Sequence, residues 1–157
     1  MQTVFGLDQF TPGWRSSTVC IGVFDGVHLG HRAIISEARD IARKSGCPAV
    51  VLTFDRHPMA LLRPDRCPKM ILAPHAKLSK IGAMNVDAAV IAVFDKSFSE
   101  QSPEEFLENI LQGKLRAEKI VVGHDFAFGH NRAGTPEWLS ERIPTTVLGP
   151  IERDGRR

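Results

Sequence analysis

The feature that most constrains the fold is a glycine-rich turn that joins an apolar run to an amphipathic helix. Residues 18–24 are apolar and β-branched, which favours a buried strand. From residue 32 onward, apolar side chains recur three or four residues apart, which predicts a helix with one buried face. That face comprises Ile34, Ile35, Ala38, Ile41 and Ala42. The segment therefore predicts the start of a strand–helix–strand unit.

The turn itself, GVFDGVHLGH, has the composition of an anion site. Gly22, Gly26 and Gly30 lack side chains, so the backbone can turn sharply and a ligand can approach it closely. A helix start presents unpaired N–H groups and the positive end of the helix dipole, and both favour a phosphate group. His28 and His31 supply imidazole donors for charge that develops on phosphoryl oxygens.

Two other interpretations of this turn remain open. The histidine pair resembles part of a metal site, but zinc needs three or four ligands, and Cys20, Cys47 and Cys67 show no ligand spacing. A glycine-rich turn can also serve packing alone. The rest of the chain has to decide between these alternatives.

The remaining sequence alternates strands with helices. Apolar runs predict further strands at residues 49–54, 88–94, 120–123 and 145–148, and helices are expected at residues 73–84, from Ser102 to Gly113, and at 136–142. Residues 1–17 are interpreted as a lead-in to the first strand. This alternation predicts an α/β, Rossmann-like, doubly wound parallel sheet of five strands in a single domain, residues 1–157.

The composition limits the classes of partner that the chain is expected to bind. The formal charge of +2 comes from 20 basic and 18 acidic residues, too balanced for a nucleic-acid surface, so no nucleic-acid partner is expected. No apolar run reaches the ~18–20 residues of a membrane span, so no membrane partner is expected. Three cysteines without paired spacing, and a start without a basic and apolar leader, predict the cytoplasm.

Two further loops follow predicted strands. Residues 55–69 hold three prolines and several basic side chains, and residues 124–134 are rich in glycine and aromatic residues. Ligands of open α/β sheets bind outside the carboxyl ends of the strands, so both loops are candidate binding segments. Alternatively, the first loop is a solvated surface segment and the phenylalanines of the second close the core.

The segment G-x-F-D-G-x-H-x-G-H resembles the signature of nucleotidyltransferases with a His-x-Gly-His motif, and this version is similar to the FAD synthetases. The collinear segment TFDRHP also resembles that family, with Arg56 in place of its usual proline. A third match comprises Gly123, Asp125, Phe126, Phe128, Gly129, Arg132 and Gly134. Together the motifs cover residues 20–135.

The resemblance implies a nucleotidyltransferase fold and adenylyl transfer from ATP to FMN, which gives FAD and pyrophosphate. His28 and His31 would be catalytic, with Mg²⁺ arriving on ATP and no metal ligands in the protein. The residues implied to bind ATP are Gly22, Phe24, Asp25, Gly26 and Gly30. The residues implied to bind FMN are Phe54, His57, Pro58, Asp125, Phe126, Phe128 and Arg132.

The chain departs from the family at its end. The family continues with an I-S-S-T-x-I-R segment and a separate riboflavin kinase domain, and this sequence stops before both, so the domain is expected to lack its C-terminal end. A nucleotide-binding module with lost or weak turnover is one alternative. A nucleotidyltransferase for another phosphorylated acceptor, such as phosphopantetheine or nicotinamide mononucleotide, is the other.

One further string resembles a known loop. Lys77-Leu-Ser-Lys80 is similar to the KMSKS loop of class I tRNA synthetases. We interpret it instead as the solvated face of a helix, because it follows the second predicted strand and not the last.

Overall fold

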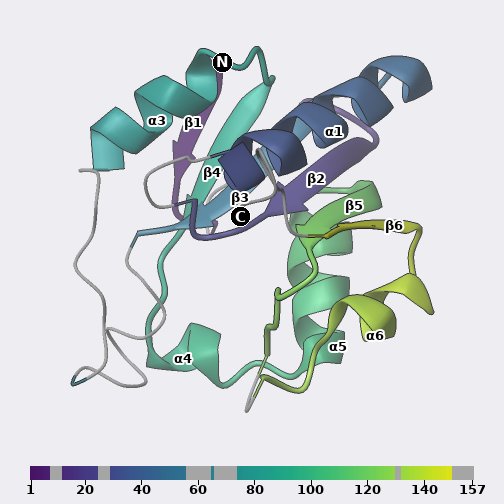
Figure 1. Ribbon diagram of the computed structural model, residues 1–157. Coiled ribbons are helices and arrows are strands. Elements are labelled where there is room, and N and C mark those ends of the chain that lie inside the picture. Colours follow the sequence, from purple (N-terminus) through teal and green to yellow (C-terminus); the bar gives the residue numbers. More distant parts are fainter. Residues whose placement is uncertain (8–11, 25–28, 56–64, 66–73, 130–131, 150–157) are drawn as a thin grey trace.

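The computed structural model describes residues 1–7, 12–24, 29–55, 65, 74–129 and 132–149 (Figure 1). Within this part, six strands form one sheet in the order β1-β4-β3-β2-β5-β6, and every neighbouring pair is parallel. The strands are β1 (Gln2–Phe5), β2 (Ser17–Ile21), β3 (Ala49–Phe54), β4 (Ala88–Ala92), β5 (Ala117–Gly123) and β6 (Thr145–Leu148). Every residue of β2, β3 and β4 is buried, as expected for strands covered on both faces.

The expectation of five strands was wrong by one, because residues 2–5 form the additional strand β1. Among the described strands it pairs with β4 alone, from Gln2 opposite Ala88 to Phe5 opposite Ile91. Its residues are mostly exposed, so the apolar pattern that predicts a buried strand is missing. The other strands are confirmed, although β2 ends at Ile21 and the chain turns over residues 22–24.

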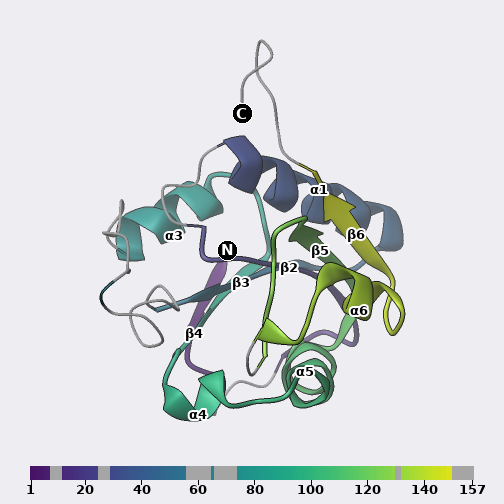
Figure 2. The ribbon, with the colours of Figure 1, turned by 60° about the horizontal axis from the view of Figure 1, so that its bottom comes forward.

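Helices cover both faces of the sheet (Figure 2). Helices α1 (Leu29–Ser45) and α3 (Pro74–Gly82) lie over one face. The opposite face carries α4 (Lys96–Ser99), α5 (Pro103–Glu105), the π-helix η2 (Phe106–Lys114) and α6 (Pro136–Ser140). The doubly wound α/β class is therefore confirmed. In the part of the chain that the structure describes, no helix combines the length and apolar character needed to cross a bilayer.

Local sequence explains several helix ends. Gly46 adopts φ +70° directly after α1, a conformation that favours glycine and ends the helix. The hydroxyl of Ser102 accepts a hydrogen bond from the Glu105 amide at 3.1 Å, and Pro103 follows as the first helical residue. Helix α4 was not among the expected helices. The Asp95 carboxylate caps it by accepting a hydrogen bond from the Phe98 amide at 2.8 Å.

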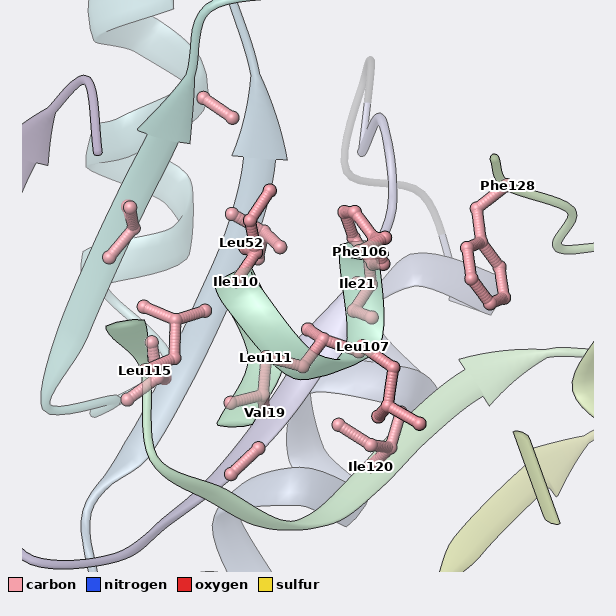
Figure 3. Packing of buried hydrophobic residues seen from close by; sticks show 14 of the residues in the cluster. Val19, Ile21, Leu52, Phe106, Leu107, Ile110, Leu111, Leu115, Ile120 and Phe128 are labelled. Atoms are coloured by element: carbon pink, nitrogen blue, oxygen red, sulfur yellow. The ribbon is translucent and has the colours of Figure 1, made fainter. Parts of the chain in front are cut away.

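The larger core lies between the sheet and η2 (Figure 3). Phe106, Leu107, Ile110 and Leu111 are all buried, as their spacing predicts. The π geometry then brings Leu115 onto the same face, because the Leu115 amide donates to Ile110 O, five residues earlier, at 2.9 Å. On the other face, the predicted stripe of α1 is confirmed: Ile35, Ala38 and Ala42 are buried.

Candidate functional site at the carboxyl edge of β2 and β5

The strand order creates a switch point between β2 and β5. From β2 the chain passes through α1 to β3 on one side, whereas β5 pairs with β2 on the other side. Because all strands are parallel, the loops that follow β2 and β5 leave the same edge of the sheet. A Cβ added at Gly123, at the end of β5, would lie 3.3 Å from Cδ1 of Ile34 in α1. The two glycine-rich segments of the sequence therefore meet at this edge.

The turn after β2 is closely packed. Phe24 is 1% exposed and adopts φ +53°, an unusual value for a residue with a side chain. A Cβ at Gly22 would lie 2.8 Å from the Phe24 ring, so glycine is needed there. The Gly22 amide donates to Leu52 O in β3 at 3.2 Å. Asp25, Gly26 and His28 lie outside the described residues.

His31 lies in the first turn of α1. Its ring meets that of Phe24 edge-on, with the centroids 5.4 Å apart and the planes at 80°. Helix α1 begins at Leu29 and has 17 residues, so Gly30 and His31 belong to the end where unpaired amides and the positive pole of the dipole lie. The predicted strand–turn–helix arrangement is confirmed on both sides of residues 25–28.

The loop after β5 is held by short backbone contacts. The Phe126 amide donates to Gly123 O at 3.1 Å, and Phe128 and Gly134 exchange two backbone hydrogen bonds of 3.1 and 2.8 Å. Gly134 has no room for a side chain, because a Cβ there would lie 2.5 Å from the Phe128 ring. Asp125 and Arg132 are exposed on this loop.

The aromatic residues of the site differ in burial. Phe128 is 8% exposed and packs against Phe106 and Trp138, with centroid distances of 5.1 and 5.8 Å. Phe126 is only half-buried and stacks on Phe128, with the centroids 5.4 Å apart and the planes at 20°. Phe54, at the end of β3, is 7% exposed. Phe126 is therefore more exposed to solvent than Phe54 or Phe128.

The loop after β3 begins with an anchored residue that the sequence reasoning did not single out. The Asp55 amide donates to Ala92 O at 3.0 Å, and its carboxylate accepts a hydrogen bond from the Phe94 amide at 2.8 Å. Asp55 thus joins the ends of β3 and β4. The predicted ligand-binding residues His57 and Pro58 lie outside the described residues.

Lys77 contradicts the interpretation of residues 77–80 as a solvated helix face. Ser79 and Lys80 are exposed, but Lys77 is only 2% exposed. Its Nζ donates to Val23 O at 2.9 Å, to Thr53 Oγ1 at 3.2 Å and to Phe54 O at 3.3 Å. The sequence held a signal for this, because Lys77 precedes the buried Ile81 by four residues and shares its helix face.

Cys20, which lies in β2, is not a candidate nucleophile. Burial raises the pKa of the Cys20 thiol to about 12, so it stays protonated at neutral pH. Among the residues that the structure describes, no group of three or more His, Cys, Asp or Glu side chains is arranged to hold a metal ion. The groups that the described residues bring to this edge are backbone amides, the His31 imidazole and the buried ammonium group of Lys77.

Comparisons with curated proteins agree with the motifs. The bifunctional riboflavin kinase/FMN adenylyltransferase of Buchnera aphidicola subsp. Acyrthosiphon pisum is 35% identical over 141 residues, which cover 90% of this chain and 45% of that protein. The protein of the same name from Pseudomonas fluorescens is 35% identical over 163 residues, covering 100% of this chain and 52% of that relative. The chain therefore spans about half the length of the curated relatives it matches.

Solved structures support the fold. The crystal structure of a macrolide-efflux protein from Streptococcus pneumoniae superimposes with a TM-score of 0.86 and 26% identity, covering 100% of this chain and 53% of that one. A lipopolysaccharide core biosynthesis protein from Thermoplasma volcanium gives a TM-score of 0.51 at 18% identity, covering 88% and 98% of the two chains, and supports the fold alone. A model of the FAD synthetase family matches residues 11–148. The chain belongs to the FAD synthetase family.

Proposed function

We propose that this chain transfers the adenylyl group of ATP to FMN, giving FAD and pyrophosphate. The observation that carries the proposal is the meeting of the β2 and β5 loops at the switch point of the sheet, where both hold the family's motif residues. Membership of the FAD synthetase family supports the same reaction. The free thiols of Cys20 and Cys47 are in keeping with a reducing compartment, so we expect the reaction in the cytoplasm.

In this reaction an oxygen of the FMN phosphate attacks the α-phosphorus of ATP. A new P–O bond forms there, the bond between that phosphorus and the bridging oxygen breaks, and pyrophosphate leaves with the electron pair. Such a step requires no enzyme nucleophile, so alignment of the phosphates and stabilisation of charge carry the catalysis. The substrate is the magnesium complex of ATP, and Mg²⁺ comes with the nucleotide.

The first turn of α1 is the proposed phosphate site. The amides near Gly30 and the positive end of the 17-residue helix attract the triphosphate, while His31, and with it His28, donates hydrogen bonds to the transferring phosphoryl group. Gly22 makes room for the Phe24 ring, and we place its backbone at the border of the ATP site. The ATP-binding roles of Phe24, Asp25 and Gly26 remain part of the proposal.

The acceptor is proposed to bind between the β3 and β5 loops. Asp125 and Arg132 are exposed there, and the half-buried Phe126 offers a ring face for a flavin. Phe54 and Phe128, both largely buried, support the site from the core side. His57 and Pro58 complete the proposed FMN-binding set.

The test is FAD formation by the chain from FMN and MgATP, separated by chromatography, together with binding of each substrate. We expect FAD, and we expect His31→Ala to lower kcat by about 10²-fold, as when one transition-state donor is lost. Asp40→Asn is the control, since Asp40 is exposed on the same helix, three turns from its start.

Three results would contradict parts of the proposal. Binding of FMN and ATP without any FAD would mean that the chain is a nucleotide-binding module. Adenylation of phosphopantetheine or nicotinamide mononucleotide in preference to FMN would mean that the acceptor is wrong. Unchanged kcat in His31→Ala would remove the proposed role of that histidine.

A further inference from the structure

Lys77 is the only buried lysine among the residues that the structure describes. Its Nζ, carried by α3, has three acceptors among the described residues: Val23 O at 2.9 Å, Thr53 Oγ1 at 3.2 Å and Phe54 O at 3.3 Å. Taking an ammonium group out of water is costly unless such partners surround it. A methionine or leucine would fill the same space without that cost, so the charge calls for a reason beyond packing.

The atoms that accept hydrogen bonds from Lys77 lie where two candidate binding loops begin. Val23 lies in the turn after β2, just before residues 25–28, and Phe54 is the last residue of β3, just before Asp55 and residues 56–64. Thr53 Oγ1 also donates to Val23 O at 2.9 Å, so the carbonyl of Val23 receives hydrogen bonds from both side chains. The ammonium group thus connects the turn after β2 with the end of β3.

The Val23 carbonyl belongs to the peptide group that leads into Phe24. Two hydrogen bonds to this oxygen fix the orientation of that peptide plane, and Phe24 follows at φ +53°, a backbone region that a residue with a side chain occupies only when its surroundings hold it there. The ring of Phe24 contacts His31 edge-on at 5.4 Å. A short chain of contacts therefore runs from Lys77 through Val23 and Phe24 to His31.

We propose that Lys77 is a positioning residue for adenylyl transfer, which holds the Val23–Phe24 turn so that His31 faces the transferring phosphate. This inference rests on the proposed function. Lys77 acts through the turn and the histidine, and it loses no proton in the reaction. Loss of its hydrogen bonds leaves the substrates bound but the phosphates and His31 misaligned, and small misalignments cost large factors in rate.

The experiment compares Lys77→Met with Lys80→Met. Methionine keeps the length of the lysine stem and removes the charged donor, and Lys80 is the matched control because it is exposed on the same helix, three residues further on. We expect Lys77→Met to lower kcat by about tenfold or more, with the KM values for ATP and FMN changed by less than about threefold. Lys77→Arg, which restores donors, should recover part of the rate. Lys80→Met should match the parent chain.

A double-mutant cycle separates positioning from a general structural role. If Lys77 acts through His31, Lys77→Met should reduce the remaining rate of His31→Ala only slightly. If it only stabilises the fold, the same factor should be lost in both backgrounds, and that result would overturn the inference. Should Lys77→Met fail to fold, Thr53→Val, which removes the hydroxyl between Lys77 Nζ and Val23 O, takes its place in the cycle.

A second measurement does not depend on turnover. NMR signals of the His31 ring, assigned by their absence in His31→Ala, should carry a shift caused by the neighbouring Phe24 ring. We expect Lys77→Met to change this shift and Lys80→Met to leave it as it is. Retention of the shift in Lys77→Met would overturn the positioning role. A chain that forms no FAD in any variant would instead refute the proposed function, and the NMR comparison would still decide the role of Lys77.

Discussion

At the scale of single residues, the site is built on glycines that face aromatic rings. Gly22 lies against Phe24 and Gly134 against Phe128, and in both pairs a Cβ would come within 2.8 Å of the ring. Phe24 in turn contacts His31, and Phe128 supports Phe126. These glycines therefore determine where the rings lie, and the rings in turn support His31 and Phe126, two candidate site residues that are partly buried.

We predict that Gly22→Ala destabilises the protein by about 1–3 kcal/mol, the usual cost of forcing an extra group into a packed interior. The new methyl group would meet the Phe24 ring at 2.8 Å, and that ring is buried among the residues on α1 and the sheet. The free energy of unfolding from urea titration measures the effect. Gly13→Ala is the control, because a Cβ there has no atom within 4 Å. Equal free energies of unfolding for the two variants would show that the turn accommodates the added methyl group without cost.

At the scale of elements, helix α5 and the π-helix η2 depend on one capping residue. The Ser102 hydroxyl accepts the Glu105 amide hydrogen bond at 3.1 Å, and the side chains that fill the larger core follow directly in η2. Because the first turn of a helix leaves its amides unpaired, the cap satisfies a donor that would otherwise need water. The cap thus fixes where the helix begins and, with it, which side chains face the sheet.

We predict that Ser102→Ala lowers the free energy of unfolding by about 1 kcal/mol, within the 0.5–2 kcal/mol typical of a lost N-cap. Ser79→Ala serves as control, since Ser79 is exposed within α3, where alanine is at least as favourable for a helix. Denaturant midpoints of the two variants give the comparison. No difference between them would mean that water replaces the cap without cost.

At the scale of the whole molecule, the sheet is stable in its centre and weaker at its two edges. Strands β2 and β3 pair on both sides and every residue in them is buried. Among the described residues, the edge strands β1 and β6 each pair with one strand, and neither contains a buried residue. The switch point lies next to the most stable strands, which gives the site a rigid base.

We predict that amide hydrogen exchange follows this order. Amides of β2 and β3 should exchange most slowly, near the limit set by global unfolding, and those of β1 and β6 should exchange through local opening at lower free energy. Exchange followed by mass spectrometry or NMR resolves the strands. Amide protection in β1 as high as in β2 would contradict the prediction that the edge strands open locally at lower free energy.

The sequence alone determined most of the fold and predicted where the candidate site lies. Continuous apolar runs predicted β2, β3, β4 and the second half of β5, because strands covered on both faces of a parallel sheet require them. The fifth predicted strand is β6, which contains no buried residue. Alternation with helices then placed the carboxyl ends of those strands at one edge. The glycine motifs at residues 22–31 and 123–134 consequently predicted a single site from local patterns.

Three features depended on the tertiary structure: the formation of strand β1, the difference in exposure between the aromatic residues of the site, and the burial of Lys77. Strand β1 receives its pairing from β4, far along the chain, so its four residues need no apolar signal of their own. Phe126 and Phe128 have the same side chain, but Phe128 packs in addition against Phe106 and Trp138 and is buried. Lys77 finds acceptors 54 and 23 residues earlier in the sequence, at Val23 and Phe54. Propensity and periodicity describe neighbours along the chain, whereas these three outcomes depend on partners that only folding brings together.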